Sequence, residues 1–246
     1  MKTLDAGLVI IQLEQCLNAL PIGTGRKLSK AVAAAEAIQL IGGFSSPSLL
    51  TKASPNFHQF AEQDGSFHGA YGNRIRHQAL NVVTKLREDP DSRQAIITLW
   101  DPVLDNVPGK KDYPCTVALQ FSVAADGALD MTTFMRSNDV WRGLPYDMFQ
   151  FTQLQMSIAN ALTLSYGSYT HIAASLHLYE ENVDAAKHLH ATNNFEWQPV
   201  GFGTRDESMT TIMRRARTVT TPGYDVPVHT PSEEWYRDIF TSYLGR

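Results

Sequence analysis

Apolar residues recur with two different periods along this chain, which predicts a protein of both helices and strands. Leu129, Met131, Thr133 and Met135 alternate with other residues, as in a β-strand that has one buried face. Residues 148–162 have the longer spacing of a helix. The same patterns predict further helices over residues 4–20, 29–41, 73–86 and 184–190, and further strands over 95–100, 117–124, 169–177 and near Thr211.

Two long segments lack either period and are predicted to be loops. Residues 45–70 are rich in Ser, Pro, Gly and aromatic side chains, and residues 101–112 are rich in Lys and Asp. Loops of this length in a compact domain are often functional. The second segment is expected to be solvated.

Composition narrows the class of protein. The 246 residues, 43% of them hydrophobic, suit one domain over residues 1–246. A net charge of −4 favours no nucleic-acid partner. The N-terminus is not expected to be a signal peptide, and no apolar run is long enough for a membrane span. Two cysteines make no disulfide framework, so a cytoplasmic location is expected. His188 and His190 are poorly spaced for a metal on a helix, and no metal is expected.

Polar and charged side chains that could bind a ligand are most numerous at residues 134–147, between the predicted strand and the helix that starts at Met148. The run Arg136-Ser137-Asn138-Asp139 supplies a cation, a hydroxyl, an amide and a carboxylate, and a Gly-Leu-Pro turn separates it from Tyr146-Asp147. A strand end followed by a polar turn and a helix is where ligand groups often gather. Composition alone is equally consistent with an ordinary polar loop.

Three other segments carry candidate functional groups. Cys115 follows a proline at the start of a predicted strand, so it is a candidate nucleophile, although a lone cysteine is more often a small core residue. Glu36 lies within an apolar helical run, where a carboxylate is either on the exposed side or useful. The Gly-rich loop 21–27, with Arg26, is able to hold a phosphate or to be only a turn.

Residues 136–147 resemble the nucleotide-binding segment of thymidylate synthase and the related pyrimidine nucleotide hydroxymethylases, Arg-Ser-x-Asp-x-x-x-Gly-Leu-Pro-x-Asn/Asp. Pro114-Cys115, the Ala-rich helix around Glu36 and Tyr71-Gly72 resemble other segments of that family, and the resemblance covers most of residues 20–180. It implies an α+β fold, in which helices cover a large mixed sheet and a sheet face is packed in a homodimer. It also implies methylenetetrahydrofolate and a pyrimidine nucleotide as substrates.

The resemblance implies a role for each matching residue. Cys115 is the expected nucleophile, and Arg136 is expected to favour its thiolate. Glu36 is expected to position or deprotonate water, and Tyr71 and Asp147 are expected to be catalytic residues of the same site. The nucleotide is expected to contact Arg26, Arg93, Arg136, Ser137, Asn138, Asp147, His177 and Tyr179, and folate to contact Phe57, Phe60, Asp139, Gly143 and Tyr146. Arg93 matches a residue that reaches the partner's phosphate.

Asp147 indicates which base is bound. Thymidylate synthases resemble this chain but have asparagine there, whose amide both donates to and accepts from uracil. An ionised carboxylate only accepts, which suits the amino group of cytosine and a protonated N3. Asn138 and Thr116 also match the hydroxymethylase pattern. The sequence therefore predicts a cytidylate hydroxymethylase acting on CMP or dCMP. The alternative is that Asp147 has no role in binding the base and only interacts favourably with the dipole at the N-terminus of its helix.

Two other functions remain open at this stage. One is methylation by a thymidylate synthase variant, and the other is a catalytically silent nucleotide-binding relative. The family's phosphate-loop arginine is absent at Pro21, and Gln94 replaces its second cross-subunit arginine. The sequence does not distinguish ribose from deoxyribose, and the usual short tail that closes over folate is not recognised.

Overall fold

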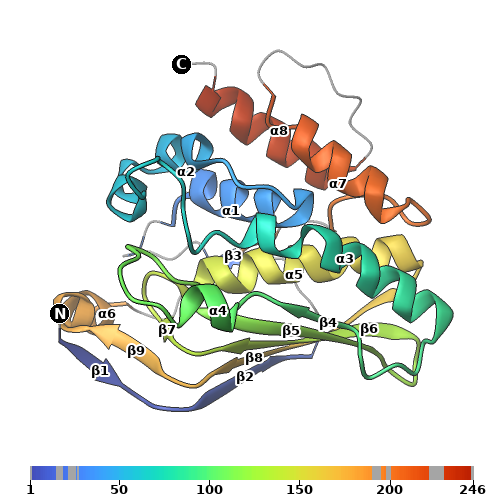
Figure 1. Ribbon diagram of the computed structural model, residues 1–246, viewed down its shortest axis with the longest axis horizontal. Coiled ribbons are helices and arrows are strands. Elements are labelled where there is room, and N and C mark those ends of the chain that lie inside the picture. Colours follow the sequence, from blue (N-terminus) through green and yellow to red (C-terminus); the bar gives the residue numbers. More distant parts are fainter. Residues whose placement is uncertain are drawn as a thin grey trace.

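The computed structural model describes residues 2–14, 19–21, 26, 28–189, 195–197, 201–221 and 230–244. Strands form one layer, and helices cover one of its faces in two further layers (Figure 1). The predictions that concern Cys16, loop residues 22–25 and 27, His190, and residues 223–225 lie outside the described residues.

The main sheet has five strands among the described residues, in the order β2-β8-β6-β5-β4. Neighbouring strands are antiparallel except β6 and β8, which are parallel. The predicted alternation along residues 129–135 is confirmed, because Leu129, Met131, Thr133 and Met135 are all buried. The strands are β2 (Val9–Leu13), β4 (Ile96–Thr98), β5 (Thr116–Val123), β6 (Ala128–Met135) and β8 (Ser165–Ala173).

Two smaller sheets lie beside it. In one, β1 (Thr3–Asp5) and β7 (Asn138–Asp139) flank β9 (Leu176–Tyr179), and in the other β3 (Ala19–Pro21) pairs with β10 (Phe195–Trp197). The strand predicted over residues 169–177 is wrong in extent. β8 ends at Ala173, and the chain changes sheet before β9, where His177 pairs with Asp5 and Asp139.

Two long helices lie directly on the sheet, a third packs on top of them, and others form an outer layer (Figure 1). The predicted helices over residues 29–41, 73–86 and 148–162 are confirmed as α1 (Lys30–Gly42), α3 (Tyr71–Glu88) and α5 (Leu144–Leu162). The outer layer contains α2 (Pro47–Ala53), α7 (Met209–Thr218) and α8 (Pro231–Leu244). Short turns of helix are η1 (Pro55–Phe60), α4 (Pro102–Asp105), η2 (Glu180–Asn182) and α6 (Val183–Lys187).

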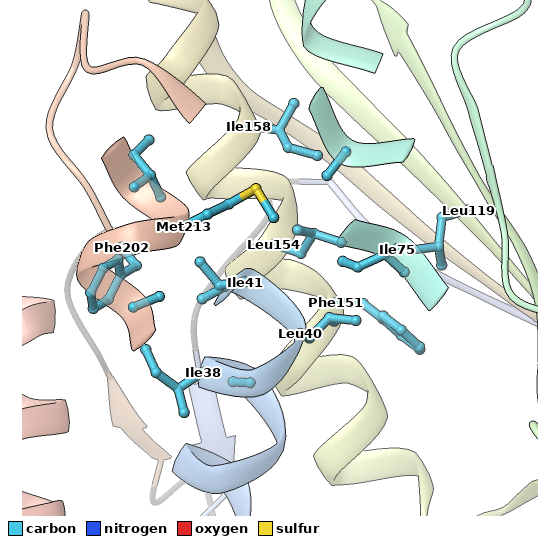
Figure 2. Packing of buried hydrophobic residues seen from close by; sticks show 14 of the residues in the cluster. Ile38, Leu40, Ile41, Ile75, Leu119, Phe151, Leu154, Ile158, Phe202 and Met213 are labelled. Carbon is cyan, nitrogen blue, oxygen red and sulfur yellow. The ribbon is translucent and has the colours of Figure 1, made fainter. Parts of the chain in front are cut away.

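Helix α1 is the centre of the hydrophobic core. Ser29 caps its first turn by accepting a hydrogen bond from the Val32 amide, and Gly43 ends it with a positive φ of 60°, which favours glycine. Ile38, Leu40 and Ile41 pack among side chains of α3, α5 and α7 (Figure 2). Nearly every side chain of α1 is therefore buried, and the partly accessible ones are Lys30 and Glu36.

The helix predicted over residues 4–20 is wrong. Leu8 and Ile11 have helical spacing, but β-branched residues dominate Val9–Leu13, and this segment pairs with β8 along its whole length. Its side chains alternate between half-buried and exposed. Pairing with β8, a strand distant in the sequence, decided the conformation here.

Three further segments differ from the sequence predictions. The expected loop at 45–70 contains α2, which begins at Pro47 and is capped by Ser46, followed by η1. The expected solvated loop at 101–112 contains α4, whose Asp105 is buried. The Thr-rich segment near Thr211 is part of α7, because Ser208 caps a helix whose apolar residues reach the core.

The face of the sheet opposite the helices is not covered by any described helix (Figure 1). Ile10 and Ile96 lie on it with 61% and 45% of their surface exposed. Large apolar side chains on an open sheet face are typical of a surface that packs against another protein. Within the described residues, no helix is long and apolar enough to cross a membrane.

Candidate active site

A cavity of about 210 Å³ opens where α1, α3 and α5 approach the segment before β5. Cys115, Glu36, Tyr71 and Asp147 all line it, so the structure brings the four predicted catalytic residues together. One part of the wall is apolar, with Leu50, Phe57, Phe60 and Phe67. Gln39, Ser45, Gly69, Ala70, Gly72, Asp112, Tyr113 and Gln150 complete the lining. No described residues form a group of three or more His, Cys, Asp or Glu side chains arranged to hold a metal ion.

Cys115 faces a cation, but it is a thiol at neutral pH. The Arg136 Nη2 lies 3.8 Å from its Sγ, and the guanidinium is fixed by donating from Nε to the Pro114 carbonyl at 3.0 Å. Burial raises the pKa of Cys115 to about 11; Arg136 opposes this shift, and the carboxylates of Asp147 and Asp112 add to it. Arg136 therefore acts on the thiol in the predicted direction, and desolvation outweighs it.

Tyr71 is held as a neutral phenol beside Cys115. Its hydroxyl accepts hydrogen bonds from the Thr116 amide at 3.3 Å and the Thr116 hydroxyl at 3.1 Å, and its ring stacks on Phe151. Burial raises its pKa well above the ordinary value, with the charge of Asp147 adding to the shift. The proton of the Tyr71 hydroxyl can be donated to a ligand in the cavity.

Asp147, in the first turn of α5, is held by two neutral amides. Its Oδ2 accepts from Asn138 Nδ2 at 2.6 Å, and its Oδ1 accepts from Gln150 Nε2 at 3.0 Å. Burial raises its pKa to about 7, although both hydrogen bonds oppose the shift. Both the ionised and the protonated form of Asp147 are therefore populated near neutral pH. The Asn138 Oδ1 is buried and accepts no hydrogen bond within the described structure.

Glu36 reaches the same cavity from α1. Burial raises its pKa to about 8, and the nearby Asp147 charge adds to the shift. Two carboxyl groups that repel each other in one cavity tend to share a proton. Glu36 is therefore mostly protonated at neutral pH, where it can orient water by hydrogen bonding, and it becomes a base as the pH rises.

Three of the residues predicted to hold the sugar and phosphate lie together around β7 and β9: Ser137, His177 and Tyr179. Ser137 Oγ is 3.4 Å from His177 Nδ1, and the His177 and Tyr179 rings are in edge contact at 5.2 Å. The Arg26 guanidinium lies over the Trp141 ring, 4.8 Å from its centroid. Arg93 is exposed at the turn between α3 and β4, and it does not line the cavity of its own chain.

The predicted folate residues divide into two groups. Phe57 and Phe60 line the apolar part of the cavity. Asp139, Gly143 and Tyr146 do not line it. Asp139 shapes the turn by accepting hydrogen bonds from the Trp141 and Arg142 amides, at 2.8 and 3.1 Å, and its Oδ2 is buried without a partner in the described part of the chain. The Tyr146 hydroxyl accepts from the Ser29 amide at 2.8 Å.

Sequence reasoning missed Asp112, Gln150 and Phe67 as lining residues. Asp112 was detectable, because it precedes Cys115 by three residues in an Asp-Tyr-Pro-Cys run. Gln150 lies three residues after Asp147 and thus on the same side of α5. Phe67 offered no signal, since only the fold brings its loop to the cavity.

Another buried carboxylate, Asp105, lies in a cluster next to this site. It accepts hydrogen bonds from Arg74 Nη1 at 2.6 Å and Arg74 Nη2 at 2.9 Å, and it is 2.8 Å from His68 Nε2. Burial raises its pKa, but the bonds from Arg74, the Asp101 amide and His68 together lower it below the ordinary value. Asp105 is therefore ionised and fully paired.

Comparison with known proteins yields one family. The profile of the family described as thymidylate synthase matches residues 7–225. The chain is 29% identical over 194 residues to the deoxyuridylate hydroxymethyltransferase of Bacillus phage SP01, covering 72% of this chain and 50% of that protein. It is 30% identical over 152 residues to the deoxyuridylate hydroxymethyltransferase of Pseudomonas phage M6, covering 59% and 43%. The chain thus spans about half the length of these curated relatives.

Two solved structures share the fold. The thymidylate synthase of T4 phage superposes with a TM-score of 0.67 at 21% identity, covering 86% of this chain and 82% of that one. The thermostable thymidylate synthase A of Bacillus subtilis gives 0.68 at 23% identity, covering 85% and 78%. The predicted α+β fold is confirmed.

Proposed function

The chain belongs to the thymidylate synthase family, and from that premise we propose that it transfers a one-carbon unit from methylenetetrahydrofolate to carbon 5 of a pyrimidine nucleoside monophosphate. We propose further that the nucleotide is cytidylate and that water completes the reaction, which yields the 5-hydroxymethyl product. The observation that carries this choice is the carboxyl group of Asp147, in the cavity that also contains Cys115.

The chemistry follows from the residues of the cavity. The Cys115 sulfur adds to carbon 6 of the base, and the electron pair of the C5–C6 double bond makes carbon 5 nucleophilic. Methylenetetrahydrofolate supplies the one-carbon unit at carbon 5. Carbon 5 then loses its proton, the bond between the one-carbon unit and the folate nitrogen breaks, and tetrahydrofolate leaves as an amine, so that the nucleotide carries an exocyclic methylene. Glu36 orients the water that adds to it, and the sulfur then leaves carbon 6.

Asp147 suits cytosine because its two oxygens can form hydrogen bonds with the N4 amino group and with N3 of the base. One oxygen accepts from the amino group, and a proton shared between the other oxygen and N3 completes the pair. The pKa of about 7 keeps that proton available at neutral pH. A hydrogen bond of this kind also withdraws electrons from the ring and so favours attack at carbon 6.

Uridylate is the second candidate substrate, for two reasons. The two phage relatives are named for deoxyuridylate. In addition, a protonated Asp147 could donate to O4 and accept from N3–H of uracil, as an amide does. Because the pKa of Asp147 is raised to about 7, a neutral carboxyl group that does not repel O4 of uracil is populated at neutral pH.

The remaining assignments belong to the same proposal. Arg26, Arg136 and Ser137 contact the phosphate, and His177 and Tyr179 contact the sugar hydroxyl. The apolar wall with Phe57 and Phe60 fits a flat aromatic ring such as that of folate. Asp139, Gly143 and Tyr146 complete the folate side once substrates are bound.

A homodimer is proposed on two observations. Ile10 and Ile96 are exposed on the open face of the sheet, and Arg93 is exposed at its edge without a role in its own cavity. Arg93 would then contact the phosphate in the partner's site. Sedimentation should show a dimer at assay concentration. Mixing Arg93→Ala chains with Cys115→Ser chains should restore about a quarter of the activity, since half the dimers are mixed and each has one complete site. A fully active monomer would refute this.

One assay tests the proposed function. The protein is incubated with methylenetetrahydrofolate and CMP, dCMP or dUMP, and the products are identified from their masses by mass spectrometry. We expect a hydroxymethyl nucleotide from a cytidylate and no rise in dihydrofolate absorbance, because no hydride is used. A stoichiometric rise would indicate methylation instead. Release of tritium from carbon 5 separates either enzyme from a silent nucleotide-binding relative.

A further inference from the structure

The proposed first step requires something that accepts the proton of Cys115. The thiol is half-buried in the cavity wall, and its pKa of about 11 leaves little thiolate at neutral pH. Buried nucleophiles of this kind are commonly activated by an adjacent base. The residues around Cys115 can be compared for that role.

Three of the neighbouring groups are poorly suited. Arg136, at 3.8 Å from the sulfur, has no acceptor. Tyr71 is a phenol whose pKa is raised well above its ordinary value, so it does not accept a proton. Asp147 already accepts hydrogen bonds from two side-chain amides, and its role in the proposed function is to bind the base.

Glu36 also lines the cavity, but its pKa of about 8 keeps it mostly protonated at neutral pH, and the proposed function assigns it to the water. Asp112 is the carboxyl group that remains, and its charge acts on Cys115. It lies three residues before Cys115 on the same segment, and both side chains line the same cavity. The Tyr113 backbone amide favours the ionised form of its carboxylate and so opposes the rise in its pKa. The carboxylate rests against Gly69, where a Cβ atom would lie only 2.3 Å from Asp112 Oδ2. A side chain at position 69 would therefore displace the carboxylate.

The segment that carries both groups is fixed by Arg136. Its guanidinium donates to the Tyr113 carbonyl at 3.4 Å and to the Pro114 carbonyl at 3.0 Å. Burial raises the pKa of Asp112, while the charges of His68, Arg136 and Arg74 lower it. The charges that act on Cys115 are those of Arg136, Asp147 and Asp112 itself.

We propose that Asp112 accepts the proton of Cys115 as its sulfur attacks carbon 6 of the nucleotide base, directly or through one water molecule. This inference rests on the proposed function. The S–H bond breaks, its electron pair forms the S–C6 bond, and the proton moves to the Asp112 carboxylate. When the sulfur leaves carbon 6 at the end of the reaction, Asp112 returns the proton and the thiol is restored.

Asp112→Asn tests the proposal because two measurements should move in opposite directions. Removing a negative charge beside Cys115 lowers the pKa of the thiol, so alkylation by iodoacetamide should become roughly threefold to tenfold faster. Exchange of tritium from carbon 5 of the nucleotide should become roughly 10²–10³ times slower, because the base is lost. Alkylation is measured at Cys115 by peptide mass spectrometry, since Cys16 is the other thiol of the chain.

Two variants serve as controls. Glu88→Gln removes an exposed carboxylate outside the cavity and should change neither rate. Asp112→Glu keeps an acceptor and should retain tritium exchange to within about tenfold of the wild type. If the Asp112→Asn variant unfolds, the Asp112→Glu variant still tests the proposal. Tritium exchange that is roughly 10²–10³ times slower in a folded Asp112→Glu variant, as expected for Asp112→Asn, would overturn the proposal.

The outcomes separate this inference from the function on which it rests. If both rates rise in Asp112→Asn, or neither changes, Asp112 is only an electrostatic neighbour and the inference fails alone. If the wild type exchanges no tritium with any pyrimidine nucleotide, the proposed function fails and the inference fails with it.

Discussion

Asp147 and Asp105 are both buried carboxyl groups, yet their surroundings shift their pKa values in opposite directions. Asp147 has two neutral amides as partners, and burial raises its pKa to about 7. Asp105 is bound by both terminal nitrogens of Arg74 and contacts His68, and its pKa is lowered. The two sites are close in the fold, since His68 precedes Gly69 of the cavity wall.

The difference lies in charge compensation. A buried carboxylate that faces a guanidinium stays ionised and stabilises the fold, whereas one that faces only amides exchanges its proton near neutral pH. Within the part of the chain that the structure describes, Glu36 likewise faces no cation, and the charge of Asp147 raises its pKa further. Groups with such pKa values cost stability and are useful for proton transfer. We therefore expect substitutions of the cavity residues to change mainly activity, and substitutions in the Asp105 cluster to change mainly stability.

The largest expected effect is that of Cys115→Ser on turnover. The hydroxyl is a far weaker nucleophile than a thiol at neutral pH, so tritium exchange should fall by roughly 10³-fold or more. The thermal midpoint should barely change, since the side chains are nearly the same size. Near-normal turnover would contradict the covalent mechanism. Nucleotide binding by calorimetry serves as the control and should be retained.

Asp147→Asn should change the choice of base. The amide suits uracil and loses the proton shared with cytosine N3, so the ratio of turnover efficiencies for dCMP and dUMP should shift toward dUMP. A mispaired buried contact costs about 1–3 kcal/mol, which corresponds to about tenfold to a few hundredfold. The change is almost isosteric, and a thermal melt checks that the variant folds. If the ratio does not move, Asp147 is not the residue that selects the base.

Asp105→Asn tests the paired side of the comparison. It leaves the Arg74 guanidinium buried without its counter-charge, so the free energy of unfolding at pH 7 should fall by about 3 kcal/mol. Because the pKa of Asp105 is lowered in the fold, this stabilisation is present above its ordinary pKa and is lost as the pH falls through the lower, folded value. Urea denaturation at pH 7 and pH 3 measures both points. Glu88→Gln should show neither loss.

Glu36→Gln should give the opposite dependence on pH, with a smaller effect. The pKa of Glu36 is raised from 4.5 to about 8. Between these values the folded state holds a proton that the unfolded state has lost, so wild-type stability decreases as the pH rises. Glutamine removes that penalty. Because the cavity admits water, we expect only about 1–2 kcal/mol of added stability at pH 8.5 and none at pH 4. A gain that is equal at both pH values would contradict the assigned pKa.

Local patterns were sufficient where one element carries its own signal. Helix α1 has its Ser29 cap and its terminal Gly43, and β6 has its alternating side chains, so both were predictable. Conformation was misjudged where pairing partners lie far away in the sequence. Val9–Leu13 is a strand because β8 lies beside it, and the segment near Thr211 is helical because its apolar side chains reach the core.

The sequence alone determined which groups are available: a cysteine after a proline, a glutamate within an apolar helix, and a carboxyl group at position 147 where related synthases have an amide. Only the tertiary structure decided the protonation of these groups. Cys115 is a thiol, and Asp147 and Glu36 hold protons near neutral pH, because the fold desolvates all three, and among the described residues the guanidinium of Arg136 opposes this only at Cys115. A pKa depends on desolvation and on every charge within a few ångströms, and residues distant in the sequence supply both.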